Sequence, residues 1–320
     1  FSARLKIGAA ADAGAAADAE SAGALGEHGG GVESGDASAR GRAGGGARHG
    51  VLRVGPQEEE FQDLASAVAV AEHGATILVS PGRYFCNLRL CKSVTIAAAR
   101  DDSDVDAACS KTEEGNGGVV LVTAGNKPVL TTVLASSGSK DQDANFEIHV
   151  VRCSIEAHTS VDRARGHSGS ADGGQVAAMR RAAHIVTVNA GVLQMRGCHV
   201  RDGALCSVMV CGTGKLLLDA CQLLPAGGGG VCVSGKGEVL LQGSVISGAL
   251  GAGLEVRGSG RVLMSRCDIS RCGKAGIFCH QSAAVDARAC IIARNGFAGV
   301  ECVGPTAHAL VRDCSLLDDS

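Results

Sequence analysis

The chain has 320 residues with 47 glycines, 15 cysteines, one tyrosine and no tryptophan, which excludes an ordinary core anchored by large aromatic rings. Because 45% of the residues are hydrophobic, a core must still form, and valine, isoleucine, leucine, alanine and cysteine have to build it. A formal net charge of −3 provides no global basic field, so we expect neither nucleic acid nor a membrane as a partner.

Residues 1–50 are rich in alanine, glycine and serine and include two runs of three glycines. This composition predicts a disordered linker over residues 1–50. No apolar signal segment follows Phe1, and no stretch approaches the roughly 18 consecutive apolar residues that a transmembrane helix needs. Together with cysteines that we expect to be reduced, these features favour a cytoplasmic location.

An ordered β-helix domain is expected over residues 51–320, and it opens with a short helix over Phe61–Glu72. Leu64, Ala67 and Val68 share one face of that helix, and His73 with Gly74 ends it. An uncovered first coil would expose unpaired backbone groups, so we interpret the helix as an N-terminal cap. After the helix we expect strands over 76–79, 88–90 and 94–96, with a turn at 80–83.

Three polar segments, near 101–118, 136–145 and 158–183, interrupt the less regular coils that follow. Insertions in a solenoid usually leave it as surface loops, where binding sites often form. Their composition is equally that of disordered surface excursions, and we favour this second interpretation.

The main feature of the sequence is a repeat of 23 residues in its C-terminal half. At equivalent positions apolar residues alternate with polar or mixed ones, which is the period-two pattern of strands with one buried face. The glycine content argues against a helical repeat. The pattern therefore predicts an all-β fold, a parallel β-helix in which each repeat is one coil of a solenoid. The aligned segments are Val192–Gly214, Lys215–Gly237, Glu238–Gly260, Arg261–Ala283 and Ala284–Thr306, followed by the incomplete Ala307–Ser320.

Small side chains fill one column of the repeat, and glycines are expected at corners that need a positive φ. Stacked coils lie about 4.8 Å apart, which is close enough for neighbouring cysteines to form disulfides, but we expect stacked free thiols. No pair of cysteines is followed by a second pair at zinc-ligand spacing, so no metal site is expected. The column contains Cys198, Cys221, Ser244, Cys267 and Cys290, with Cys314 one residue late.

Two stretches, Phe61–Ile96 and Val192–Ser320, resemble the right-handed parallel β-helix proteins of the pectin-lyase-like superfamily. The first carries Ala75-Thr-Ile-Leu-Val-Ser-Pro-Gly-Arg-Tyr84, which is similar to the opening of many such domains, pectin methylesterases included. The second resembles the non-enzymatic repeats of certain F-box proteins and SHC-binding spindle proteins. The resemblance implies a right-handed, single-stranded β-helix, and it identifies a fold that hosts many functions.

The regular coils show no motif for catalysis. The outward column of Asp219, Gln242, Ser265 and Arg288 holds one carboxylate, whereas glycoside hydrolysis needs a pair. The Asn-Thr-Asp and Gly-His-Gly motifs of polygalacturonases are absent from the sequence, and the acidic run Asp101–Asp104 lies in an insertion. We therefore expect no catalytic residue, no cofactor and no metal, and do not expect an enzyme.

One column of the repeat contains apolar residues that the fold itself does not require. Leu217, Leu240 and Leu263 should point outward, since their neighbours in each strand point inward, and a row of exposed leucines is a candidate partner-binding face. Alternatively, another part of the chain covers this row or the strand is bowed. The expected function is a non-catalytic scaffold that binds a protein partner through its outer face and loops. The alternative is a carbohydrate-active or carbohydrate-binding domain whose site is degenerate or lies outside this fragment.

Overall fold

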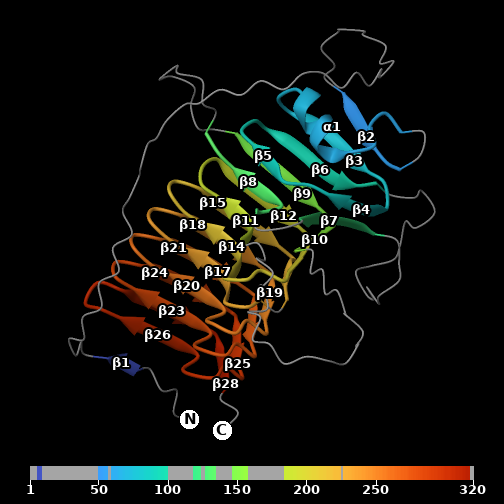
Figure 1. The fold of residues 1–320 in the computed structure, drawn as a ribbon. Coiled ribbons are helices and arrows are strands. Elements are labelled where there is room, and N and C mark those ends of the chain that lie inside the picture. Colours follow the sequence, from blue (N-terminus) through green and yellow to red (C-terminus); the bar gives the residue numbers. More distant parts are fainter. Residues whose placement is uncertain are drawn as a thin grey trace, which may run out of the picture.

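In the computed structural model, the strands form three parallel sheets around one interior (Figure 1). The expected linker over residues 1–50 lies outside the described residues, except for Lys6–Gly8 and Gly50. The predicted insertions also lie outside them, apart from Gly118. The structure describes residues 6–8, 50–56, 59–99, 118–123, 127–134, 146–157, 184–224 and 226–317.

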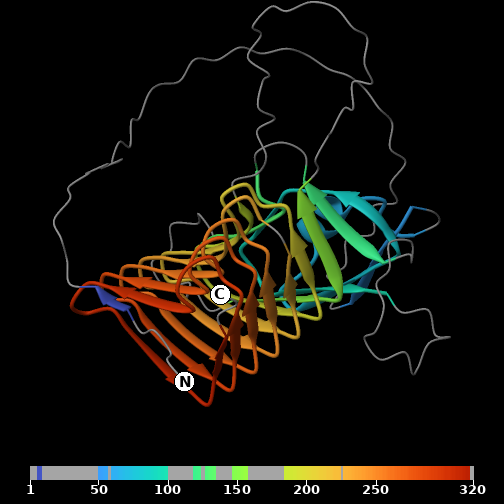
Figure 2. The same cartoon turned by 90° about the horizontal axis from the view of Figure 1, so that it is seen from below.

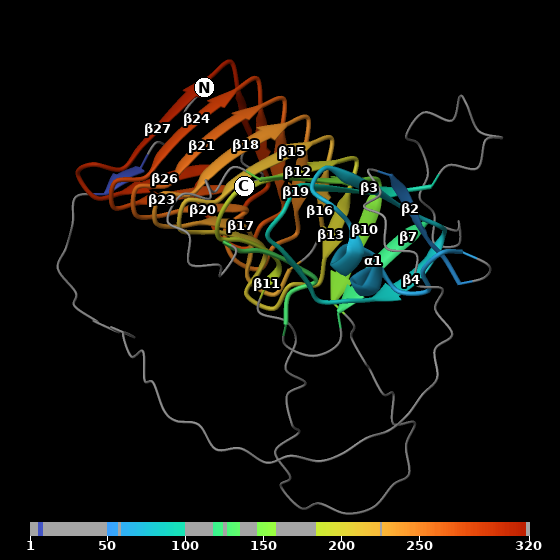
Figure 3. The same cartoon turned by 90° about the horizontal axis from the view of Figure 1, so that it is seen from above.

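The chain winds as a solenoid. We call the three sheets A, B and C, and their strands are given below. Each complete coil passes through one strand of sheet B, one of sheet C and one of sheet A before the next coil begins. Figures 2 and 3 show the strands of successive coils stacked along one axis, from the blue and cyan strands that follow residue 50 to the red C-terminal strands, where the dark blue β1 (Lys6–Gly8) pairs with β26 (Val300–Val303). The predicted parallel β-helix is thereby confirmed.

Sheet B has ten strands and sets the register of the solenoid. Lys215 pairs with Glu238, and Glu238 pairs with Arg261, which confirms the 23-residue repeat. Ala284 pairs with His308, so the last coil contains one additional residue. Its strands are β2 (Val51–Val54), β3 (Ala75–Val79), β6 (Val94–Ala98), β9 (Glu147–Val151), β12 (Val192–Arg196), β15 (Lys215–Asp219), β18 (Glu238–Gln242), β21 (Arg261–Ser265), β24 (Ala284–Arg288) and β27 (His308–Arg312).

Sheet C has nine strands, most of them short. Its first strand starts at Gly82, inside the segment predicted to be a turn, so the turn is shorter than expected. Tyr84 of that strand points into the core, and its hydroxyl donates a hydrogen bond to the Ser80 carbonyl at 2.8 Å. The strands are β4 (Gly82–Phe85), β7 (Val119–Thr123), β10 (Cys153–Ala157), β13 (His199–Arg201), β16 (Gln222–Leu223), β19 (Val245–Ser247), β22 (Asp268–Ser270), β25 (Ile291–Ala293) and β28 (Ser315–Leu317).

Along the strands of sheet A, inward-facing and outward-facing residues do not simply alternate. In its strand over 229–233, Gly229, Gly230 and Val231 are all buried, and a Cβ atom at Gly229 would lie 3.0 Å from Sγ of Cys232, so these two positions share one face of the sheet. The same run of three buried residues opens the strand of the preceding coil, and the two strands pair one-to-one. The strands are β1 (Lys6–Gly8), β5 (Leu88–Leu90), β8 (Leu130–Thr132), β11 (His184–Val188), β14 (Cys206–Val210), β17 (Gly229–Val233), β20 (Leu254–Val256), β23 (Ile277–His280) and β26 (Val300–Val303).

The N-terminal end of the solenoid carries α1 (Leu64–Val70), which buries Leu64, Ala67 and Val68 against the core (Figure 3). The helix is shorter than predicted because Asp63 caps it: the Asp63 carboxylate accepts a hydrogen bond from the Ser66 amide at 2.8 Å. No helix among the described residues is long and apolar enough to cross a membrane.

The glycines at the start of the sheet A strands have a different role from the one expected. Gly230 and its counterparts one and two coils later, Gly253 and Gly276, do not have positive φ values. A Cβ atom at Gly230 would instead lie 2.4 Å from Cγ2 of Ile246 in sheet C, and Ile269 faces Gly253 in the same way. These glycines make room for β-branched side chains. At the corner between sheets A and B, Gly212, Gly235 and Gly258 do have positive φ values, which confirms the expectation there. At the corner between sheets B and C, mostly residues other than glycine adopt positive φ values: Arg152, Gly197, Ala220, Gly243, Arg266, Ala289 and Asp313.

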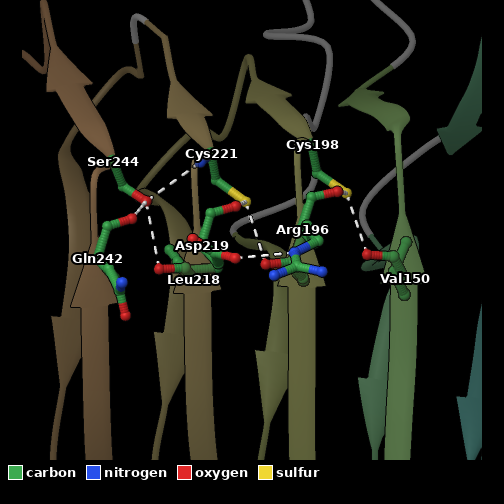
Figure 4. Close-up of polar contacts among 9 residues, drawn as sticks. Val150, Arg196, Cys198, Leu218, Asp219, Cys221, Gln242 and Ser244 are labelled. Atoms are coloured by element: carbon green, nitrogen blue, oxygen red, sulfur yellow. Dashed lines mark hydrogen bonds and ion pairs between the residues drawn. The ribbon is translucent and has the colours of Figure 1, made fainter.

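The column of small residues lies inside this same corner (Figure 4). The Cys198 thiol donates to the Val150 carbonyl at 3.3 Å, and the Ser244 hydroxyl makes the equivalent bond to Leu218 at 3.3 Å. The column continues to Cys314, whose sulfur accepts a hydrogen bond from the Cys290 amide at 3.3 Å. Every described cysteine is a free thiol, as expected.

Candidate functional site

The leucine face consists of Leu217, Leu240 and Leu263 on the outer surface of β15, β18 and β21. Cross-strand pairing places the three residues in one column, as predicted. Leu240 is 40% exposed and Leu263 is 55% exposed, while Leu217 is half-buried. Among the described residues, the column therefore forms an apolar row on the solvent side of sheet B.

Charged residues flank the leucine face on both sides. On one side the Lys215 ammonium lies 2.9 Å from the Glu238 carboxylate, and on the other Arg196 Nε lies 2.8 Å from Asp219 Oδ2. These exposed pairs contribute little to stability, but they keep the apolar row narrow and surround it with polar groups. At the Leu217 end the face descends into a shallow depression of about 330 Å³. Residues from β9, β12, β15 and β18 line it: His149, Val151, Gln194, Met195, Arg196, Leu217, Leu218, Asp219, Leu240 and Gln242.

A second concave surface, the sheet A groove, has a volume of about 530 Å³ and crosses β17, β20 and β23. Small residues, among them Gly229, Gly251 and Ala252, form its floor. Sheet A provides one wall, and the connection from sheet C to sheet A provides the other. The lining residues are Leu205, Gly228, Gly229, Cys232, Gly251, Ala252, Glu255, Lys274, Ala275, Phe278, Phe297 and Glu301.

Sequence reasoning missed this groove. It contains two of the six phenylalanines, Phe278 and Phe297, although the composition had suggested that few aromatic rings could line a site. Glu255 and Glu301 belong to the same outward column as Phe278. That column, with two carboxylates around an aromatic ring, was a signal in the sequence that could have located the groove.

Next to Glu255 lies His280, with its Nε2 atom 3.7 Å from the carboxylate. The His280 ring also contacts the Phe278 ring, with a distance of 5.2 Å between the ring centroids. A carboxylate and an aromatic ring of the groove wall thus have an imidazole beside them.

A cysteine–histidine contact occurs in the two strands of sheet A that precede β17, where the Cys206 thiol of β14 lies 2.9 Å from Nδ1 of His184 in β11. The pKa of Cys206 is raised by its hydrogen bond with Cys232 and by burial, so the thiol stays protonated. Burial, and then the charge of Arg257, lower the pKa of His184. Both groups are therefore neutral near pH 7, whereas a cysteine nucleophile requires a thiolate beside its base.

Sheet C carries a buried carboxylate. Glu156 of β10 is 5% exposed at its side chain, and each of its oxygens binds one arginine. Oε1 accepts from Arg83 at 2.5 Å, and Oε2 accepts from Arg201 Nε at 2.7 Å. Because both oxygens are satisfied, we interpret Glu156 as a structural group that ties three coils together. Among the described residues, no group of three His, Cys, Asp or Glu side chains is placed to hold a metal ion.

Comparison with known proteins identifies the handedness of the solenoid. A family model described as a right handed beta helix region matches residues 183–318, which cover the regular coils. The fold is a right-handed parallel β-helix. No curated protein matches the chain at a significant level.

Several solved structures share this β-helix fold. The pectin methylesterase from Aspergillus niger in its deglycosylated form is 14% identical with a TM-score of 0.54, over 84% of this chain and 86% of that one. A penultimately deglycosylated form is 14% identical with a TM-score of 0.50, over 86% and 87%. The pectin methylesterase PemA from Erwinia chrysanthemi is 13% identical with a TM-score of 0.44, over 77% and 79%. The two Aspergillus niger structures show a shared fold, and identities this low transfer no activity or substrate to this chain.

Proposed function

We propose that this chain is a non-catalytic interaction module that binds a protein partner through the leucine face. The observation that carries the proposal is the in-register column of partly exposed Leu217, Leu240 and Leu263, bordered by charged pairs. An apolar row with a polar rim is the usual composition of a protein-binding patch.

The spacing of the row favours an amphipathic helix as the bound element. Consecutive leucines of the column are about 4.8 Å apart along the solenoid axis, since each belongs to the next strand of a parallel sheet. One turn of an α-helix rises about 5.4 Å, which is close to the spacing of the leucines, so the apolar side chains of successive turns can each contact one of the three leucines. The depression beside Leu217 offers room for a larger side chain at one end of that stripe.

The proposal is tested by quantitative affinity purification with the complete protein and its Leu240→Asp and Leu263→Asp variants. Leu250→Asp is the matched control, because Leu250 is 71% exposed and lies in the connection from sheet C to sheet A. We expect both leucine-face variants to lose a partner that the control retains.

The partner is then purified and titrated directly, and the contact segment is mapped to an amphipathic helix. Loss of affinity by at least about tenfold for Leu240→Asp supports the proposal. Unchanged partners in both leucine-face variants, or equal loss in the Leu250→Asp control, reject it.

A further inference from the structure

The sheet A groove differs from the leucine face in chemistry as well as position. It runs along the solenoid axis, because Glu255, Phe278 and Glu301 occupy successive coils of one register column. The opposite wall is also a column, in which the Phe297 amide donates to the Lys274 carbonyl. An elongated ligand that lies along the axis would therefore meet both walls over several coils.

The charge of the groove is mainly acidic. Two carboxylates and one ammonium line it, from Glu255, Glu301 and Lys274. Lys6 of β1 pairs in register with Glu301 at the edge of sheet A, and the Glu255 carboxylate lies 3.7 Å from Nε2 of His280. A cationic ligand in the groove would add a charged partner to both carboxylates.

The aromatic rings restrict the ligand further. Phe297 is 67% exposed, and it belongs to the wall opposite Phe278. Arginine and lysine side chains place their apolar stems against such rings while the charged head group reaches a carboxylate. Two rings beside two carboxylates are thus suited to basic side chains, and less suited to purely aliphatic ones.

The separation of the two carboxylates determines the backbone of the ligand. Glu255 and Glu301 are two coils apart, which corresponds to about 9.6 Å at the strand spacing of a sheet. In a polyproline II segment, residues three apart point the same way and are separated by about 9.3 Å. We propose that the sheet A groove binds an extended basic peptide in which arginine or lysine side chains three residues apart reach Glu255 and Glu301.

An oligosaccharide is the other elongated ligand that a β-helix groove can hold. A uronic acid chain would bring carboxylates against Glu255 and Glu301, which is unfavourable without a cation between them. A neutral sugar chain would gain no charge attraction from either carboxylate. The groove's charge therefore favours the peptide, and sugar binding is one of the outcomes that the experiment distinguishes.

The test is fluorescence anisotropy with the complete protein and the labelled peptide Gly-Pro-Arg-Pro-Pro-Arg-Pro-Gly. Its control is Gly-Pro-Pro-Arg-Arg-Pro-Pro-Gly, which has the same composition but adjacent arginines. Glu301→Gln and Phe297→Ala alter the groove, and Glu238→Gln is the matched control on sheet B. Far-UV circular dichroism checks that each variant is folded. If one of the two groove variants does not fold, the other is sufficient for the test.

We expect the first peptide to bind more tightly than the second, with Glu301→Gln weakening binding at least about tenfold and Glu238→Gln changing it less than about twofold. Leu240→Asp should leave peptide binding unchanged, so this inference can fail independently of the proposed function. The inference is overturned by no binding up to about 1 mM peptide or by equal affinity for both peptides. It is also overturned by equal effects of Glu301→Gln and Glu238→Gln, or by a groove that binds neutral or uronic oligosaccharides and not the peptide.

Discussion

Adjacent leucines of β18 provide the sharpest test of which side of sheet B faces the core. Leu241 is fully buried, whereas Leu240 is 40% exposed. Replacing Leu241 by alanine should destabilise the protein by about 3–4 kcal/mol, because the substitution removes buried carbons and leaves a cavity among rigid neighbours. Leu240→Ala removes the same three carbons, worth about 2.4 kcal/mol at full burial, but little more than half of that side chain is covered. No cavity forms at the surface, so we expect a loss of about 1.4 kcal/mol at most.

The assay is equilibrium unfolding in urea followed by far-UV circular dichroism, because a chain with no tryptophan and one tyrosine gives little intrinsic fluorescence. The two variants are compared by their midpoints and by the urea dependence of the free energy of unfolding, which should be the same for both. Equal midpoint shifts, or a larger shift for Leu240→Ala, would refute the assignment of Leu240 to the outer face.

Three further predictions concern the interior and its titration. Cys221→Ser should change the free energy of unfolding by less than about 1 kcal/mol, because Ser244 already makes the same carbonyl contacts one coil later; a larger loss in urea unfolding contradicts this. Gly230→Ala should lower the free energy of unfolding by about 1–3 kcal/mol, because its Cβ would lie 2.4 Å from Ile246 Cγ2. Adding Ile246→Leu should restore part of that stability, since leucine has no Cγ2 methyl group. If the double variant is no more stable than Gly230→Ala, the contact is not the cause. Burial lowers the pKa of His184 below that of the unfolded chain, so its stabilising contribution is present above about pH 6.5 and is lost as the pH falls; unfolding free energies of the protein and of His184→Gln from pH 5 to 8 should converge at the acid end.

The regular coils could be predicted because each of their columns is a stack of equivalent positions. Parallel strands in register place residue 217 beside 240 and 240 beside 263, so aligning the repeats is the same operation as building the sheet. The leucine face and the column of small residues both followed from that alignment. The strand at Gly82–Phe85 could not be predicted from that alignment, because it lies outside the regular repeat and its glycine is typical of a turn.

The sheet A groove required the tertiary structure for a different reason. Its two walls belong to separate columns, and the run of three buried residues at Gly229–Val231 interrupts the alternation between them. Period-two reasoning assigns Gly229 and Cys232 to opposite faces of the sheet, whereas both line the groove. The glycine column shows the same limit, since its cause is the Ile246 methyl group of another sheet.

Composition and repeat length by themselves determined a narrow solenoid with a core of small aliphatic and cysteine side chains, because a coil of 23 residues leaves no room for many aromatic rings. The tertiary structure alone decided which outward residues share a concave surface. In-register stacking is a local, nearest-neighbour property that a sequence repeats visibly, whereas a groove depends on how two sheets and their connection meet at a corner.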